Sequence, residues 1–106
     1  MIDIKKKVLY VDDIRNPKYN LLSYEVTLAR TYKSAIESLL KFEYDIVDLD
    51  NDLGEEKEGY DIAKFIVENN IYIPYIYIHT MNPVARDNMK QLLEKNTNSK
   101  IAIINI

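Results

Sequence analysis

Residues 45–54 are apolar at the start of the segment and acidic at its end, and this pattern limits the folds that the chain can adopt. The side chains of Asp48, Asp50 and Asp52 recur at every second position, which places them on one face of an extended backbone. A carboxylate is almost never fully buried unless it is paired or bound to a metal. The end of this predicted strand is therefore either an exposed rim or an ion site.

Short apolar runs of the kind that form strands recur along the chain and alternate with helical patterns. The predicted strands span residues 8–11, 24–29, 45–50, 75–79 and 100–105. The predicted helices run from the cap Thr31 to about residue 42, over residues 60–69, and over residues 84–95 with Asn82 as the cap. The interval between the first two strands is barely long enough for a parallel crossover, so we expect its helix to be reduced to a turn or two. This alternation predicts an α/β fold with a mostly parallel sheet.

Composition narrows the class of protein. A chain of 106 residues, 47% hydrophobic and 29% charged, is typical of one globular domain. The net charge of -3 argues against an extensive nucleic-acid surface or binding to an anionic membrane. The chain has no cysteine, which excludes disulfides and thiolate metal sites and fits a cytoplasmic location. No signal peptide or membrane span is expected, and the sequence leaves the oligomeric state open.

Polar side chains gather where three of the predicted strands end. In open α/β sheets, ligands bind beyond the carboxyl ends of the strands. We therefore expect a site formed by Asp12, Asp13, Asp50, Asp52, His79 and Thr80. A calcium loop starting at Asp48 is excluded, because Leu53 and Gly59 occupy the positions that require glycine and glutamate.

The layout resembles the receiver domain of response regulators, and it is more similar to the cyclic-phosphate-processing receiver domains of bacteria and phages. The matching segments are Asp12-Asp13-Ile14-Arg15-Asn16-Pro17, Asp50-Asn51-Asp52-Leu53-Gly54, Gly59-Tyr60-Asp61, and His79-Thr80-Met81-Asn82-Pro83 with the following Arg86. Asn51 stands where that family has a histidine. Residues 101–106 lack the lysine that ordinary receivers carry after their fifth strand, and no final helix follows. The resemblance implies a flavodoxin-like, receiver-like sheet of five strands in the order 2-1-3-4-5.

The resemblance also implies roles for the strand-end residues. Asp12, Asp13, Asp50 and Asp52 would hold Mg²⁺ or Mn²⁺, since hard cations favour carboxylate oxygens. The alternative is a rim of acids paired with lysine or arginine, and Asp52 can equally serve only as a turn residue.

His79 is the only histidine and is predicted to act as a general acid or base, or as a metal ligand. Its alternative role is a hydrogen-bonded core histidine. Phosphate binding is assigned to Arg15, Thr80, Asn82 and Arg86. The structural alternatives are pairing of Arg15 with Asp12, a strand-end contact for Thr80, a helix cap for Asn82 and a surface charge for Arg86. Residues 55–58 are expected to be a solvated loop or a lid.

The function that this resemblance implies is that of a metal-dependent phosphoesterase acting on cyclic phosphates or phosphodiesters of nucleotides, with His79 and Asp50 as catalytic residues. The ligand would be a small nucleotide or another cyclic phosphate. The alternative is a non-catalytic receiver-like module that binds a nucleotide signal or a partner protein. A residual phosphoacceptor role for Asp50 is a third hypothesis.

Overall fold

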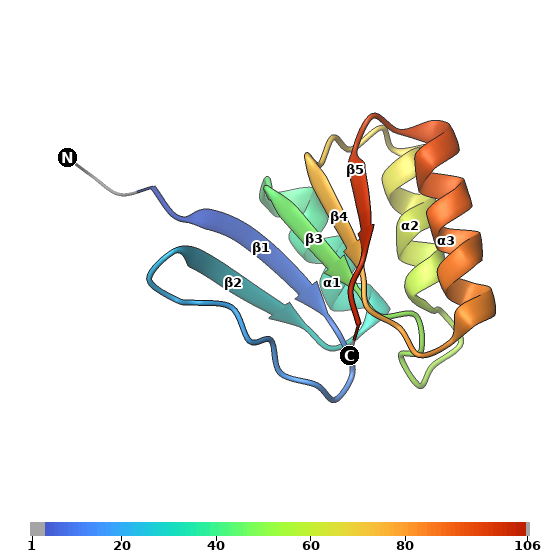
Figure 1. The fold of residues 1–106 in the computed structure, drawn as a ribbon, viewed down its shortest axis with the longest axis horizontal. Helices are drawn as coiled ribbons and strands as arrows, with labels where there is room; N and C mark the ends of the chain where they lie inside the picture. The colour runs from blue at the N-terminus through green and yellow to red at the C-terminus, as the bar shows by residue number, and fades with distance from the viewer. Residues whose placement is uncertain (1–3, 106) are drawn as a thin grey trace.

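Five parallel strands form a single sheet in a computed structural model that describes residues 4–105 (Figure 1). The strands are β1 (Lys6–Val11), β2 (Tyr24–Ala29), β3 (Ile46–Leu49), β4 (Tyr75–Ile78) and β5 (Lys100–Ile103). The helices are α1 (Tyr32–Lys41), α2 (Gly59–Glu68) and α3 (Pro83–Asn96). The strand order β2-β1-β3-β4-β5 confirms the predicted fold class.

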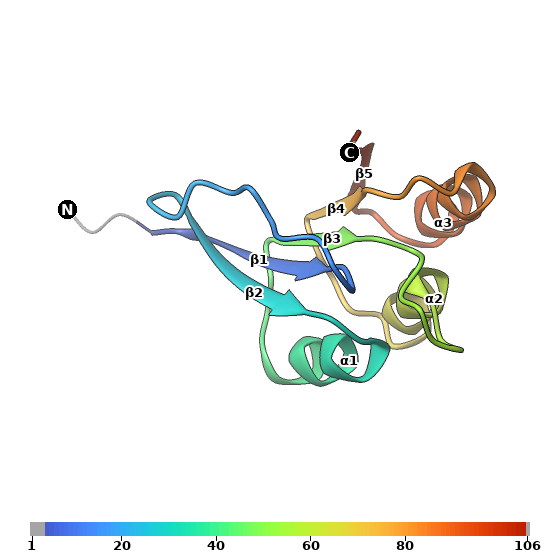
Figure 2. The same ribbon diagram turned by 90° about the horizontal axis from the view of Figure 1, so that it is seen from below.

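The three helices of the described residues lie on one side of the sheet, as Figure 2 shows from below. Alternate strand side chains point to this side and form the core with the apolar faces of the helices. The fully buried members of this core include Leu9, Val11, Val47, Leu49, Ile62, Ile66, Ile76, Ile78, Met89 and Leu93. The core therefore sits between the sheet and a single helical layer.

Residues 12–23 connect β1 to β2 without a helix. The shortened helix predicted there is only a hydrogen-bonded turn, in which the N–H groups of Ser23 and Tyr24 donate to the Asn20 carbonyl at 3.0 and 2.9 Å. The segment instead runs along the side of the sheet opposite to α1 (Figure 2).

Local capping explains where two of the helices begin. The Thr31 hydroxyl accepts from the Ser34 N–H at 3.1 Å, and the Asn82 side chain accepts from the Ala85 N–H at 3.1 Å. Each cap satisfies a donor that has no partner within its helix. Pro83 follows Asn82 as the first helical residue, one position before the predicted start at residue 84.

The register of the sheet determines which residues meet at its carboxyl edge. Val11 pairs with Leu49, and Leu49 pairs with Ile78, so the residues that follow these three positions come together.

Within residues 4–105, no helix combines the length and the apolar character that crossing a lipid bilayer requires.

Candidate functional site

Asp12, Asp50 and His79 form a buried cluster at the carboxyl edge of the sheet. Their backbones extend the parallel ladder by one step: the N–H groups of Asp50 and His79 donate to Val11 and Leu49 at 2.9 Å. Each of the three residues is at most 3% exposed. A ligand atom from each lies within 4.8 Å of the others. Three neighbouring strands thus bring chemically active groups to one point.

The imidazole of His79 is fixed on every side. Its ring stacks on Tyr10, with 4.6 Å between centroids and 8° between planes. Its Nδ1 contacts Asp48 Oδ1, and its Nε2 lies 3.0 Å from Asp12 Oδ2. The second oxygen of Asp48 accepts a hydrogen bond of 2.7 Å from the Tyr19 hydroxyl. With Nδ1 held by Asp48, Nε2 is the nitrogen that faces the cluster.

Asp48 is a site residue that sequence reasoning left without a role. It is 4% exposed and alternates in β3 with the core residues Val47 and Leu49, so its side chain points to the side of the sheet opposite to the helices. A signal for it existed, because a carboxylate in the middle of an apolar strand needs a buried partner and the chain has one histidine.

Arg15 lies over the cluster and connects it to solvent. Its Nη1 is 3.6 Å from Asp12 Oδ2 and 3.7 Å from Asp50 Oδ2, and its side chain is 37% exposed. The backbone N–H groups of Ile14 and Arg15 donate to Asp12 Oδ1 at 3.0 and 2.7 Å. The predicted pairing of Arg15 with Asp12 is present, and the same guanidinium faces Asp50.

Arg30 is a second residue that the sequence did not reveal. It follows β2, and its guanidinium donates to the Arg15 carbonyl at 2.7 Å and to the Asn16 side chain at 2.6 Å. These bonds tie the segment after β1 to the end of β2 and hold the backbone of Arg15 in place.

The electrostatic environment shifts the pKa values of Asp12 and Asp50 in opposite directions. Burial would raise the pKa of Asp12, but hydrogen bonds from the Arg15 and Ile14 backbones and from His79 outweigh it, so this pKa lies below its usual value. Burial, together with the nearby charge of Asp12, raises the pKa of Asp50. Asp12 is thus stabilised as an anion, whereas Asp50 carries charge less readily.

The surroundings of His79 favour the protonated form of its imidazole. Burial would lower its pKa, but the hydrogen bond and the charge of Asp48, followed by the hydrogen bond of Asp12, raise the pKa above its usual value. A proton on the imidazole is therefore favoured while carboxylates alone surround it.

Two predicted metal ligands lie outside the buried cluster. Asp13 is half-buried, with Oδ2 3.3 Å from the point where a Cβ on Gly54 would lie. Asp52 is exposed and accepts from the Asn51 side chain at 3.1 Å. Among residues 4–105, the compact ligand set contains Asp12 and Asp50 but neither Asp13 nor Asp52.

The predicted phosphate-binding residues are placed differently from one another. Thr80 is buried next to His79, and its hydroxyl accepts from the Asn82 N–H at 3.2 Å. Asn82 serves as the cap of α3. In the part of the chain that the structure describes, the recorded ionic contact of Arg86 is with Asp87, at 3.6 Å, and none joins it to the cluster.

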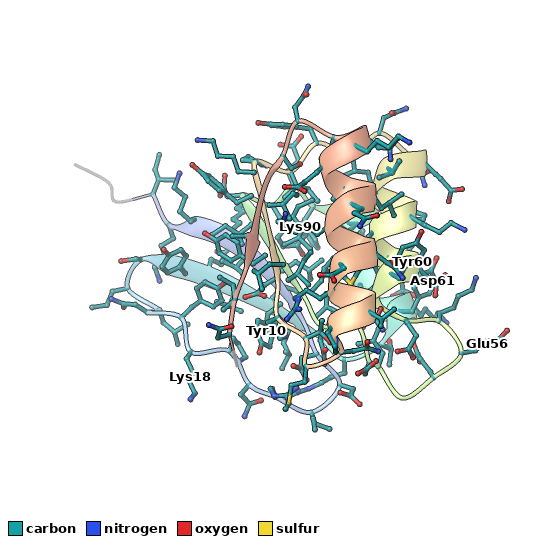
Figure 3. All side chains as sticks on the ribbon, turned by 45° about the vertical axis from the view of Figure 1, so that its right-hand side comes forward. Tyr10, Lys18, Glu56, Tyr60, Asp61 and Lys90 are labelled. Atoms are coloured by element: carbon teal, nitrogen blue, oxygen red, sulfur yellow. The ribbon has the colours of Figure 1, made fainter. Side chains whose placement is uncertain are left out.

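Asn51, which replaces a histidine of the similar family, has a structural role. Its side-chain oxygen accepts from the Tyr60 N–H at 2.9 Å, and its carbonyl accepts from the Gly59 N–H at 2.8 Å. Asn51 thereby attaches the start of α2 to the end of β3. The acidic loop beyond it is exposed, and Figure 3 shows Glu56 pointing away from the molecule.

Comparison with known proteins gives one family match. A family model described as "Cyclic-phosphate processing Receiver domain" matches residues 7–95. No curated protein matches the sequence.

Similar solved structures are response-regulator receiver domains. The receiver domain of a Francisella response regulator has a TM-score of 0.71 and 20% identity, over 92% of this chain and 84% of the other. A Thermotoga maritima response regulator in complex with Mg²⁺ and BeF has a TM-score of 0.68 and 19% identity, over 93% and 85% of the two chains. At these identities the likeness shows the fold alone.

Proposed function

Because the chain belongs to the cyclic-phosphate-processing receiver domain family, we propose that it hydrolyses the cyclic phosphate of a nucleotide at the cluster of Asp12, Asp50 and His79. The observation that carries this proposal is the convergence of two buried carboxylates and an imidazole at one strand edge, beside a guanidinium. Carboxylates and imidazole supply cation ligands or proton carriers, and a guanidinium binds phosphate.

The donor set fits a divalent cation of the Mg²⁺ or Mn²⁺ kind. Asp12 and Asp50 offer carboxylate oxygens, and the charge repulsion between them is the kind that a cation relieves. The hydrogen bond between His79 and Asp48 resembles the outer contacts that orient metal-site histidines. When bound, such a cation polarises a phosphoryl oxygen and lowers the pKa of an attacking water.

The chain's own residues supply substrate binding and proton transfer. Arg15 is only loosely paired, at 3.6 and 3.7 Å, so its guanidinium can turn to two phosphoryl oxygens without losing a short ion pair. As water adds to phosphorus and releases its proton to solvent, His79, which presents Nε2 to the cluster, would donate its proton to the ring oxygen that leaves phosphorus. Asp48 keeps the other nitrogen engaged, so the proton-transferring atom is always the same one.

The proposal is tested by incubating 2′,3′- and 3′,5′-cyclic nucleotides with the protein and Mg²⁺ or Mn²⁺, and separating the products by chromatography. We expect metal-dependent ring opening, and we expect Asp50→Asn to abolish it. Asp52→Asn is the matched change at an exposed acid, and its rate of ring opening should stay within about threefold of the native rate. Equal turnover by native protein and Asp50→Asn would rule out the proposed site.

The variant His79→Gln distinguishes a role of His79 in proton transfer from a role as a metal ligand. If His79 transfers the proton, this variant binds Mn²⁺ with native affinity and loses about 10²-fold or more in turnover. A parallel loss of Mn²⁺ binding, measured by calorimetry, would instead assign Nε2 as a third metal ligand.

A non-catalytic binding module is the second candidate, because the matching family model describes a receiver domain. It predicts stoichiometric nucleotide binding without product in the same assay. The absence of cysteine fits a cytoplasmic location for either function.

A further inference from the structure

The side of the sheet that carries no helix contains a cavity of about 500 Å³. It lies between the side chains of β1, β3 and β4, the segment 12–23, and the residues that follow β5. Its lining includes Tyr10, Tyr19 and Tyr77 as aromatic walls. Small-molecule sites in proteins have volumes of several hundred Å³, so this cavity is large enough for one.

The cavity arises because only part of this face is covered. Parallel sheets are ordinarily covered on both faces, whereas here the described helices all pack on one. The segment 12–23 covers Tyr10 and Asp48, which are 6% and 4% exposed. Tyr77 remains partly exposed, and Ile104 is 39% exposed at the edge of the cavity.

The cavity is continuous with the candidate site, since His79 and Arg15 belong to both. A ligand whose phosphate lies against Arg15 therefore has direct access to the space beside Tyr77. Asp48 lies in the wall between the two regions, where its bonds to Tyr19 and His79 link them.

The chemistry of the lining indicates what the cavity binds. Tyr77 offers a partly exposed ring on which a planar base can stack, and stacking on aromatic side chains is tolerant of base identity. Asn105, an exposed lining residue, carries both a hydrogen-bond donor and an acceptor, and Asn16 offers its amide N–H groups because its side-chain oxygen accepts from Arg30. Lys18 adds a positive charge next to Arg15, and Figure 3 shows it projecting from the segment 12–23.

We propose that this cavity holds the nucleoside part of the ligand, with the base against Tyr77 and the phosphate directed toward Arg15 and the acidic cluster. The inference rests on the proposed function in taking a nucleotide as the ligand. It adds that affinity for the base comes from the helix-free face of the sheet.

Binding is measured first without metal, so that the result does not depend on turnover. Adenosine, 2′,3′-cyclic AMP and glycerol 1,2-cyclic phosphate are titrated in EDTA, and backbone amide shifts are followed by NMR. The glycerol compound carries the same five-membered cyclic phosphate without a base. We expect adenosine and the nucleotide to shift the amides of Lys18, Tyr77 and Ile104, and the glycerol compound to leave Tyr77 and Ile104 unchanged.

Two tyrosines of one strand provide a matched pair of variants. Tyr75 and Tyr77 lie on the same face of β4, but only Tyr77 lines the cavity. Tyr77→Leu should weaken binding of the cyclic nucleotide about tenfold, and Tyr75→Leu should leave it unchanged. Equal affinities of the native protein and Tyr77→Leu would overturn the proposal.

A second pair avoids the interior of the fold. Lys18→Ala removes an exposed cavity charge, and Lys64→Ala removes an exposed charge from α2. The first should weaken nucleotide binding about threefold and the second should not change it. If Tyr77→Leu does not fold, equal nucleotide affinities of the two lysine variants overturn the proposal by themselves.

The two proposals fail in different ways. Metal-free binding of adenosine in the cavity without any ring opening would contradict hydrolysis and support the cavity. Ring opening of glycerol 1,2-cyclic phosphate and 2′,3′-cyclic AMP with equal KM, together with no adenosine binding, would support hydrolysis and overturn the cavity.

Discussion

A carboxylate buried in a central strand destabilises a protein unless its partners compensate for the lost hydration, and Asp48 has two such partners. Tyr19, in the segment that crosses the helix-free face, binds one carboxylate oxygen of Asp48. His79, at the end of the adjacent strand, binds the other. Because the contact of Asp48 with the cluster is made through the Nδ1 atom of His79, we regard Asp48 as a positioning residue.

Asp48→Asn should lower turnover about 10- to 100-fold, because the imidazole loses the charge that orients it, as for outer contacts in metal sites. KM should change less than turnover, since Arg15 and Tyr77, which are proposed to hold the phosphate and the base, are not altered. Steady-state kinetics checks both quantities. Asp45→Asn is the control, because Asp45 binds the Lys7 N–H at the other end of the same strand. Native turnover in Asp48→Asn would contradict the positioning role.

Asp50→Asn should stabilise the metal-free protein, because the raised pKa of Asp50 shows that the fold disfavours its charge. We expect a gain on the order of 1 kcal/mol in the free energy of unfolding. Since the raised pKa makes the charged form destabilising, the gain should be largest at neutral pH and shrink as acid protonates Asp50 in the native protein.

Thermal melts in EDTA and in Mn²⁺ check this prediction. Mn²⁺ should raise the melting temperature of the native protein and leave that of Asp50→Asn unchanged, because the variant lacks one ligand. A variant that is less stable than the native protein in EDTA would show that the Asp50 charge is well compensated by the fold.

At the scale of elements, α2 begins in close contact with the end of β3. A Cβ on Gly59 would lie 2.0 Å from the Asp50 carbonyl oxygen and 2.7 Å from the Asn51 Cα. Only glycine fits here, because the neighbouring atoms belong to the backbone and cannot turn away. The helix thus fixes the backbone that carries Asp50.

Gly59→Ala should therefore cost about 3 kcal/mol or more in the free energy of unfolding, the upper range for overpacking. Urea denaturation measures this cost, with Glu56→Ala in the exposed loop as a control within about 0.5 kcal/mol of native. A change below 1 kcal/mol would mean that α2 can shift away from β3.

The elements themselves could be predicted from the sequence because each has a strong local signal. Apolar runs, the caps Thr31 and Asn82, and Pro83 gave every strand and helix to within about two residues. The lack of a helix between β1 and β2 was only partly predicted, since it depends on how residues 12–23 pack on the sheet. The role of Asp48 was missed because the alternation of side chains along a strand predicts which face of the sheet a residue lies on, but not its hydrogen-bond partner.

At the scale of the whole molecule, the sheet has a helical layer on one side and, within residues 4–105, a single connecting segment on the other. The inner strands β1, β3 and β4 are paired on both edges, whereas β2 and β5 are paired on one. The catalytic candidates thus lie on the best-supported part of the sheet, and the cavity lies beside its least covered face.

Hydrogen exchange should follow this arrangement. Amides of β1 and β3 should exchange slowest, those of β5 faster, and those of residues 12–20 fastest, because few backbone bonds protect that segment. Mass spectrometry of exchanged peptides tests the order. Slower exchange in residues 12–20 than in β3 would show that the connecting segment is part of the stable core.

Because His79 is the single histidine, its NMR signals report on the candidate site without ambiguity. One imidazole, clamped between Asp48 and Asp12 and stacked on Tyr10, yields one pair of ring nitrogen resonances in a histidine-labelled sample, free of overlap. The Nδ1 resonance senses Asp48 and the helix-free face, and the Nε2 resonance senses the acidic cluster. Spectroscopy can therefore observe both halves of the site separately, without an added probe or a substitution.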